Sequence, residues 1–328
     1  MNEQHITLLQ PDTYIYIGWG ILLFLSLVAG MICYFSKRRW LKWISALPVC
    51  LLWPIFLYGA YVGVCQLEVK HVDLAFEAIP EAFDGYTIVQ FSDVHTGTLT
   101  GRRLELLKTA MDSINAQKAD MVVFTGDLQN KVPSEIDPCR SLLSSIKAKD
   151  GVYSVMGNHD YTMYDDGDAL EQYTNSGLRE SVDEELGWIP LNNARCFIHR
   201  GDQRLVIAGM DNDGDGVRFP QNGDLSSALY RVKRQDFVVL LEHDPSAWRR
   251  KILPHSHVQL TLSGHTHGGQ LSLFGLSPAM LRYKENSGLY TVGNRCLYVS
   301  NGLSGVVPFR VGVPAEITVI TLHKKQKK

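Results

Sequence analysis

The segment Tyr86-Thr87-Ile88-Val89-Gln90-Phe91-Ser92-Asp93-Val94-His95 is the starting point for interpreting this chain. Its first six residues are largely apolar or β-favouring, and the run ends at side chains that can bind a metal ion. In extended backbone, residues two positions apart project to the same side, so Asp93 and His95 can reach one ion together. Asp-x-His arises often by chance, however, so the segment matters because its arrangement recurs.

Four later segments repeat this arrangement of a short apolar run followed by polar side chains. The polar clusters are Gly126-Asp127, Gly157-Asn158-His159-Asp160, His243-Asp244 and Gly264-His265-Thr266-His267. The runs before them, at 121–125, 151–156, 237–241 and 258–262, have the length and composition of buried strands. The clusters are therefore predicted at the C-terminal ends of strands, where α/β proteins place binding residues.

Other segments complete an α/β pattern. Residues 101–118 have apolar side chains at helical spacing. The segments 204–208, 288–292, 296–300 and 316–322 are strand-like, and we expect them in a second sheet. Two packed sheets flanked by helices are the expected fold.

The clustered side chains suit a pair of metal ions. Imidazole nitrogens and carboxylate oxygens together suit Mn²⁺, Fe and Zn²⁺. The Asp127 carboxylate has two oxygens and can bridge two ions, whereas Asn158 offers a neutral carbonyl oxygen. Two ions about 4 Å apart acidify a water molecule and clamp phosphoryl oxygens. We therefore expect a hydrolase of phosphate esters that depends on two divalent ions.

His159 and Asp160 are candidates for the proton transfer that such a reaction needs. His159 is spare when the ligands are counted, so we expect it to protonate the leaving oxygen. Asp160 is expected to hold that imidazole in the right tautomer and orientation. His243 has an alternative as an ordinary core histidine, with Asp244 capping a helix before Pro245, although its place after a strand favours ligation.

In this order, the motifs resemble those of the calcineurin-like metallophosphoesterases, over residues 88–270. The resemblance implies an α/β fold, the four-layer αββα sandwich, with His159 as leaving-group acid. It implies that one ion is bound by Asp93, His95, Asp127 and His267. It implies that the second is bound by Asp127, Asn158, His243 and His265. Asp160 stands where many members have Glu, which keeps a carboxylate.

Two uncharged spans, 13–36 and 43–67, precede this domain. Each exceeds the roughly 20 residues that a helix needs to cross a bilayer. We predict a membrane anchor over residues 1–66, with transmembrane helices at about 14–35 and 43–65, and a phosphoesterase domain over 67–328. A cleaved signal peptide is the alternative, but residues 1–13 lack Lys and Arg and the apolar run is too long.

The loop between the spans, Lys37-Arg38-Arg39-Trp40-Leu41-Lys42, carries four positive charges. Such loops stay in the cytoplasm, which predicts a two-pass protein of the bacterial inner membrane with its catalytic domain on the outer side. Gly268-Gly269-Gln270 and the two spans look most similar to the membrane-associated bacterial branch of the family. That branch includes UDP-2,3-diacylglucosamine pyrophosphatases and implies a lipid-linked substrate. Those enzymes act at the cytoplasmic face, so the side of the membrane stays open.

The charge and the cysteine content argue against a nucleic-acid binder and against a disulfide-bonded protein. The net charge of −2 lacks the basic footprint of a nucleic-acid binder. The three cysteines of the soluble part imply no disulfide framework. The turn 211–216 resembles a calcium loop, but Asn222 occupies the twelfth position, so we expect an acidic surface turn.

A membrane-tethered metal-binding scaffold without turnover is the alternative function. The oligomeric state, and the preference among monoesters, diesters and pyrophosphates, are left open by the sequence.

Overall fold

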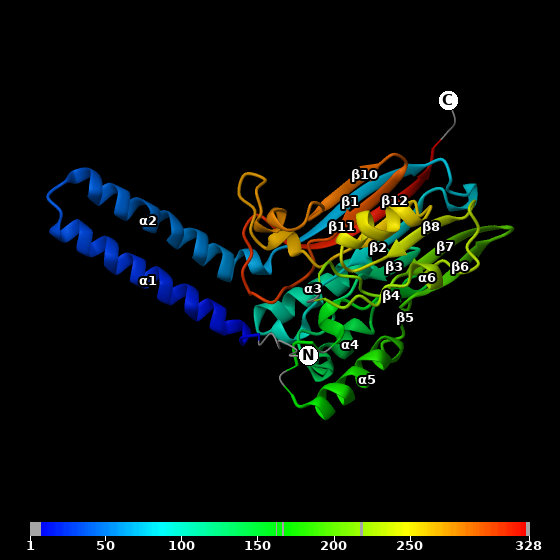
Figure 1. Ribbon diagram of the computed structural model, residues 1–328, viewed down its shortest axis with the longest axis horizontal. Coiled ribbons are helices and arrows are strands. Elements are labelled where there is room, and N and C mark those ends of the chain that lie inside the picture. The colour runs from blue at the N-terminus through cyan, green and yellow to red at the C-terminus, as the bar shows by residue number, and fades with distance from the viewer. Residues whose placement is uncertain (1–7, 162, 166, 217–218, 326–328) are drawn as a thin grey trace.

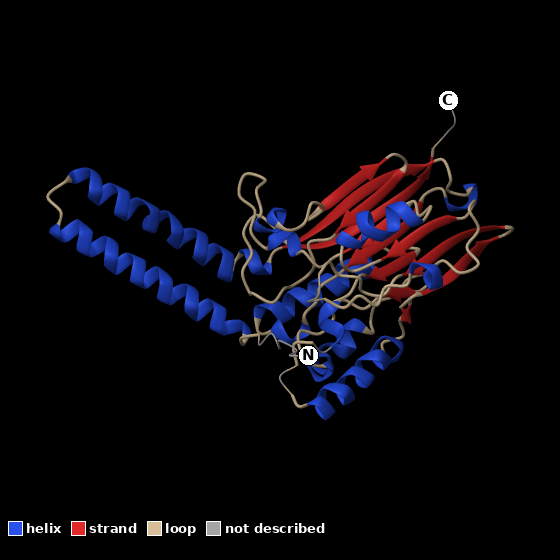
Figure 2. Cartoon of the chain, in the orientation of Figure 1, coloured by secondary structure: helices blue, strands red, loops and turns tan. Residues whose placement is uncertain are grey.

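The computed structural model describes residues 8–161, 163–165, 167–216 and 219–325. Two six-stranded sheets face each other, and a long helical hairpin projects from one end of this domain (Figures 1 and 2). The hairpin consists of α1 (Pro11–Phe35) and α2 (Arg39–Tyr61).

The first sheet carries three of the five polar clusters. Its order is β1 (Leu67–Phe76), β12 (Ala315–Lys324), β2 (Tyr86–Phe91), β3 (Met121–Phe124), β4 (Val152–Ser154) and β5 (Ile189–Pro190). The strands β2 to β5 are parallel, so their C-terminal ends share one edge. β12 runs antiparallel to β2 and parallel to β1.

The second sheet carries the other two clusters. Its order is β10 (Gly288–Val292), β11 (Arg295–Val299), β9 (Leu260–Ser263), β8 (Phe237–Leu241), β7 (Gln203–Gly209) and β6 (Ala194–Arg200). The four central strands are parallel, and β10 and β6 are antiparallel edges. The predicted placement of 316–322 in this sheet is wrong: it pairs with β1 and β2 instead. Strand spacing alone does not specify which neighbour a strand pairs with.

Three hydrophobic cores separate four layers. The first sheet packs on α3 (Arg102–Ala116), α4 (Arg140–Leu143) and α5 (Ala169–Glu185). The second sheet packs on α6 (Leu225–Ala228), a π-helical turn (Trp248–Ile252) and α7 (Leu253–His255). Between the sheets, apolar side chains from both inner faces form the third core. This α/β/β/α layering confirms the expected fold class.

Short 3₁₀ segments connect these elements. They are Gly63–Cys65, Glu81–Phe83, Thr96–Thr98, Pro133–Cys139, Asn158–Tyr161, His267–Gly269 and Pro278–Leu281. Three of them begin within or directly beside a polar cluster, so they turn the chain sharply after a strand.

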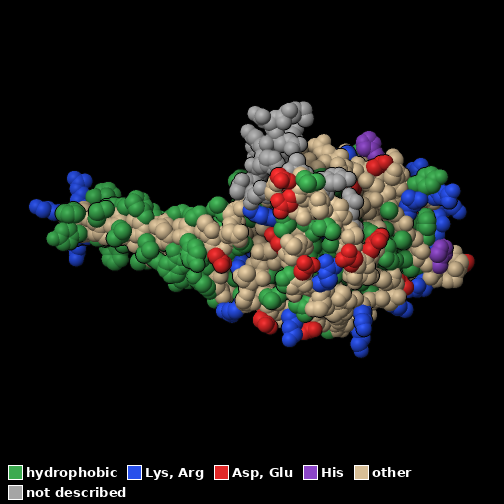
Figure 3. All heavy atoms as spheres, turned by 90° about the horizontal axis from the view of Figure 1, so that it is seen from below, with side chains coloured by type: hydrophobic (Ala, Val, Ile, Leu, Met, Phe, Trp, Pro, Cys, Tyr) green, Lys and Arg blue, Asp and Glu red, His purple; other side chains and the backbone are tan. Residues whose placement is uncertain are grey.

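Both hairpin helices are long and apolar enough to cross a membrane, by length and composition. They pack on each other through Trp19 and Trp53, whose ring centroids are 5.3 Å apart. The outward side chains are mostly apolar and exposed, and Lys and Arg side chains gather at the free end of the hairpin (Figure 3). An apolar surface of this extent needs a cover other than water.

Candidate metal centre

Each predicted ligand follows a strand end, and the two sheets bring these ends together. Asp93 and His95 follow β2, Asp127 follows β3, and Asn158 follows β4. His243 follows β8, and His265 and His267 follow β9. Within each sheet, backbone bonds join neighbouring loops, since the amide of Gly264 donates to the His243 carbonyl and the amide of Asp93 to the Gly126 carbonyl. Between the sheets, the amide of His265 donates to Asp93 Oδ1 at 3.1 Å.

One half of the site is formed by Asp93, His95 and His267, whose potential ligand atoms lie within 4.8 Å of one another. His267 Nε2 is 3.6 Å from Asp93 Oδ1, and His95 Nε2 is 3.6 Å from Asp127 Oδ2. All four side chains are wholly or largely removed from water. The Asp127 carboxylate therefore borders this half.

The other half is formed by Asp127, His243 and His265, again with ligand atoms within 4.8 Å. His243 Nε2 lies 3.2 Å from Asp127 Oδ2 and 3.2 Å from His265 Nδ1. Asn158 Nδ2 donates to the Tyr164 hydroxyl at 3.1 Å. Asp127 thus belongs to the second half and borders the first through His95.

The backbone at these ligands is held in an unusual conformation. Asp93, His95, Asp127, His265 and His267 all have positive φ angles, between 44° and 73°. Non-glycine residues rarely adopt this region, and strain of this kind collects at functional sites, where surrounding structure holds it. Five such residues in one cluster indicate that the backbone is arranged to aim these side chains inward.

Two glycines allow the loops to approach each other closely. A Cβ added at Gly157 would collide with Asp127 Oδ1, and it would lie 2.6 Å from the Asp127 amide nitrogen. A Cβ at Gly126, where φ is +95°, would lie 2.6 Å from His243 Nδ1. Both positions therefore require glycine because a side chain would displace a predicted ligand.

Burial and mutual charge set the protonation of the site. Burial lowers the pKa of His95 to about 3 and that of His265 to about 4, with neighbouring histidines acting in the same direction. Burial also lowers the pKa of His243, but the carboxylates of Asp127 and Asp93 outweigh it and raise that pKa to about 10. Without a metal, His243 and Asp127 form a buried ion pair, whose proton a metal ion would displace.

Several buried polar atoms at the centre fit a metal ion. Among the described residues, both ring nitrogens of His95 and Oδ1 of Asn158 lack a hydrogen-bond partner. Unpaired buried groups of this kind are costly and need an explanation. A nitrogen and oxygen donor set with unused lone pairs matches divalent Mn, Fe or Zn.

His159 lies at the border of the first half. Its ring is edge-on to His95, with centroids 4.6 Å apart, and stacks on Tyr164 at 4.1 Å. Its Nδ1 is 2.7 Å from the Asn130 carbonyl oxygen. Nδ1 therefore carries the proton, which it donates to this oxygen. This leaves Nε2 as the exchangeable position.

The sequence predicted that Asp160 holds the His159 ring, but this prediction is wrong. In the described structure, the Asn130 carbonyl holds the ring. The Asp160 carboxylate instead accepts from the backbone amides of Asp127 and Gly157, both at 2.9 Å, and from Arg179 Nε at 2.9 Å. Its side chain turns toward the backbone because these amides point at it from the neighbouring strand end. Asp160 is a positioning residue for two ligand loops.

Sequence reasoning missed Tyr283 and under-used Asp244. The Tyr283 hydroxyl lies 2.7 Å from His265 Nε2, and Asp244 Oδ2 lies 3.6 Å from the same atom. Asp244 also accepts from the Ser246 amide at 2.8 Å, as the capping alternative predicted. Adjacency to His243 was a signal for Asp244, whereas nothing local marked Tyr283.

The expected acidic surface turn at 211–216 is only partly at the surface. Asp213 is fully buried and forms ion pairs with Arg250, at 2.7 Å, and with Lys251. These cations come from the π-helical turn after β8, which the sequence pattern did not place beside the loop. The prediction was wrong for Asp213 because its countercharges are distant in sequence.

Comparison with known proteins finds relatives of the segment that carries these residues. The family model of the calcineurin-like phosphoesterases matches residues 86–269, which include every predicted ligand. An uncharacterised metallophosphoesterase of Bacillus subtilis (strain 168) is 32% identical over 275 residues, covering 81% of this chain and 88% of the relative.

Two further proteins extend the comparison. A transmembrane protein with a metallophosphoesterase domain from Danio rerio is 29% identical over 275 residues, covering 82% of this chain but 60% of the relative. The chain therefore matches about three-fifths of that relative's length. The solved dimetal phosphatase of Danio rerio is 14% identical, with a TM-score of 0.40, covering 69% of this chain and 89% of its own.

Proposed function

Because this chain belongs to the calcineurin-like phosphoesterase family, whose members are metal-dependent phosphoester hydrolases, we propose that it cleaves phosphate esters at the centre described above. The observation that carries the proposal is Asp127, whose carboxylate borders both groups of potential ligands. The proposed ligands of the first ion are Asp93, His95, Asp127 and His267. The proposed ligands of the second are Asp127, Asn158, His243 and His265.

When bound, the two ions supply Lewis acidity at the phosphoryl oxygens and a hydroxide nucleophile at neutral pH. The protein's own part is to keep His95 and His265 neutral and Asp127 anionic, and to exclude water around them. Burial supports this role, because it favours neutral imidazole at His95 and His265. The charge that develops on the phosphoryl group then meets a fixed, largely dry surrounding.

His159 is proposed as the acid that protonates the leaving oxygen. Its Nδ1–H is occupied by the Asn130 carbonyl, so Nε2 is the atom that would carry the transferred proton. The Tyr164 ring stacked on it restricts the imidazole to one orientation. Asp160 contributes by holding the loops that carry Asp127 and Asn158.

We further propose that the substrate is lipid-linked or lies close to a bilayer. The apolar loop, defined as residues 273–281, exposes Phe274 completely and Leu281 almost completely. The residue before it, Ser272, donates its amide to the Val311 carbonyl at 2.8 Å. Two residues before Val311, the ring of Phe309 stacks on Phe56 of α2, with the ring centroids 6.3 Å apart.

The apolar loop therefore lies beside the domain end of the hairpin (Figure 1). It leads directly to Tyr283, whose hydroxyl contacts His265. A bilayer crossed by α1 and α2 would meet this loop, and exposed apolar side chains gain free energy on entering the membrane interface. A phosphate carried on a lipid would then reach the centre along the loop.

The proposed location is a bacterial inner membrane crossed twice, with the catalytic domain on the outer side. The positive charges of residues 37–42, at the free end of the hairpin, support this orientation. The resemblance to UDP-2,3-diacylglucosamine pyrophosphatases supports a cytoplasmic substrate instead. Protease accessibility of the C-terminus in intact cells distinguishes the two, because only an outward domain is digested.

The full-length protein in detergent tests the hydrolase proposal. Bis(p-nitrophenyl) phosphate should be cleaved with added Mn²⁺, and a chelator should stop the reaction. Asp127→Asn should abolish turnover, whereas Asp112→Asn, at an exposed position on α3, should leave it unchanged. Turnover that persists in Asp127→Asn contradicts the proposal, and a metal-loaded parent without turnover on any phosphoester favours the scaffold alternative.

A further inference from the structure

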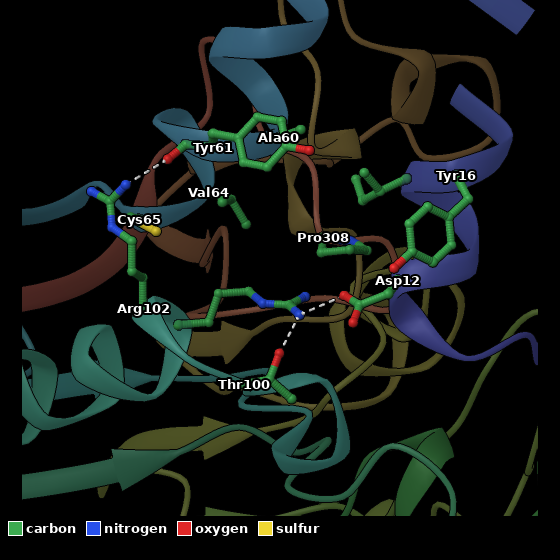
Figure 4. Close-up of a pocket in the computed structure, with 11 residues that line it drawn as sticks. Asp12, Tyr16, Ala60, Tyr61, Val64, Cys65, Thr100, Arg102 and Pro308 are labelled. Carbon is green, nitrogen blue, oxygen red and sulfur yellow. Dashed lines mark hydrogen bonds and ion pairs between the residues drawn. The ribbon is translucent and has the colours of Figure 1, made fainter. Parts of the chain in front are cut away.

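A cavity of about 320 Å³ lies where the helical hairpin meets the phosphoesterase domain. This junction pocket is bounded by Asp12 and Tyr16 of α1, by Ala60 and Tyr61 of α2, and by Arg102 and Arg103 at the start of α3 (Figure 4). It is separate from the metal centre, since it shares none of the proposed ligands. Its walls combine two guanidinium groups with apolar surface from both hairpin helices.

Arg103 is the central polar group of the junction pocket. Its side chain is only 9% exposed, and burial lowers its pKa. Nη2 donates to Thr100 Oγ1 at 2.8 Å and to Asp12 Oδ1 at 3.3 Å. Among the described residues Nη1 has no partner. A buried guanidinium with one long ion pair and an unused donor favours a further anion.

The charges around the pocket also favour an anion. Arg102 is exposed and donates one Nη1 hydrogen bond to the Tyr61 carbonyl at 3.2 Å. Figure 4 shows its side chain at the margin of the junction pocket, beside Cys65 and the Tyr61 carbonyl. Two arginines against the single carboxylate of Asp12 leave one net positive charge. One phosphodiester carries the matching charge.

The position along the hairpin places the pocket at headgroup depth. α1 has 25 residues, so it is roughly 37 Å long at about 1.5 Å per residue, and it exceeds a hydrocarbon core of about 30 Å. Asp12 and Tyr16 lie in its first turns, and Tyr61 ends α2. The Trp19 indole donates to the Tyr61 hydroxyl at 3.1 Å, which is typical of interfacial aromatic side chains.

We propose that the junction pocket binds the phosphodiester of an anionic phospholipid, with the acyl chains lying along the apolar side of the hairpin. The proposal rests on the membrane insertion proposed above. Ala60, Val64 and Pro308 give the pocket apolar walls that a free phosphate would not use. A bound lipid would join the hairpin to α3 through Arg102 and Arg103, and so fix the domain against the bilayer surface.

Native mass spectrometry of the full-length protein in detergent tests this proposal with phosphatidylglycerol, phosphatidylcholine and inorganic phosphate as probes. One phosphatidylglycerol should be retained in preference to phosphatidylcholine. Arg103→Gln should weaken its binding about tenfold or more, since a charge-assisted hydrogen bond is lost. Arg102→Gln, at an exposed position, should weaken it severalfold even if Arg103→Gln fails to fold. Arg234→Gln, exposed before β8, is the charge-matched control and should bind as the parent does.

The outcomes separate this proposal from the proposed function. If the parent, Arg102→Gln and Arg103→Gln retain phosphatidylglycerol equally, the proposed lipid binding at the junction pocket is wrong. Displacement of the lipid by millimolar inorganic phosphate overturns the lipid assignment. Asp127→Asn should still bind the lipid, because the metal centre is elsewhere. Extraction of the chain from membranes by alkaline carbonate would instead refute the membrane insertion on which the junction pocket and the lipid-linked substrate rest, and would leave the hydrolase proposal untouched.

Discussion

Arg179 and Asp160 form a buried ion pair beneath the loops that carry the proposed ligands, with Nε 2.9 Å from Oδ1. Both side chains are almost completely excluded from water. Arg179 reaches this position from α5 and also pairs with Asp183 at 3.0 Å. Asp160 in turn accepts the amides of Asp127 and Gly157, so a helix on the outer layer supports the centre through a single carboxylate.

Removing this support should destabilise the fold. Arg179→Gln leaves two buried carboxylates without their countercharge, which costs about 3–5 kcal/mol. Thermal unfolding of the full-length protein in detergent should show a Tm lower by roughly 10 °C. Arg140→Gln removes a partly exposed pair with Glu185 and should cost less than about 1 kcal/mol. Equal shifts in both variants would contradict the buried-pair argument.

Gly157→Ala should empty the metal centre while leaving the protein folded. The added Cβ would collide with Asp127 Oδ1 and push the shared carboxylate out of place. Elemental analysis should find less bound metal, and turnover should fall with it. Gly177→Ala is the matched control, because a Cβ there meets nothing within 4 Å. In the middle of α5 that change should stabilise by up to about 1 kcal/mol. Full metal content in Gly157→Ala would refute the steric role.

His159→Ala should lower the turnover of substrates with poor leaving groups by about 10²–10⁴-fold. A p-nitrophenolate leaving group needs little protonation, so its release should be affected far less. Metal content should match that of the parent, since His159 is not among the proposed ligands. A uniform loss on all leaving groups, or a loss of metal, would assign His159 to ligation instead.

Asp211 should make stability depend on pH. Burial, with the charge of Asp160, raises the pKa of Asp211 to about 6, against about 4 in an unfolded chain. The folded state then binds the proton more tightly, so this contribution is present below pH 4 and is lost as the pH rises through 6. Between pH 4 and 7 the parent should lose about 2 kcal/mol relative to Asp211→Asn. A stability difference that is flat with pH would contradict the shift.

The apolar loop should matter only for substrates held in a bilayer. Phe274→Ser with Leu281→Ser removes its two most exposed apolar side chains and no contact within the domain core. Hydrolysis of a phospholipid-borne phosphoester in vesicles should fall severalfold, whereas cleavage of soluble bis(p-nitrophenyl) phosphate should not change. Equal effects on both substrates would show that the loop supports the centre rather than the bilayer contact.

Local patterns predicted much of this molecule. The apolar runs before Asp93, Asp127 and His243 are strands because they are too short for a typical helix and rich in β-favouring residues, and the polar residue after each marks the end of the run. The hairpin was predictable for the same reason, since uncharged stretches of this length form helices that satisfy their own backbone. The polar side chains proposed as ligands, and their order along the chain, are read from the same segments.

The sequence alone thus determined the strand ends, the polar clusters that follow them and the apolar hairpin, because each depends on neighbours within a few positions. Only the tertiary structure decided that Asp160 faces Arg179 rather than His159, that β12 joins the first sheet, and that Tyr283 reaches His265. These relationships join segments far apart in the chain. Which of many chemically equivalent partners a side chain meets depends on how whole layers pack, and no local pattern encodes that choice.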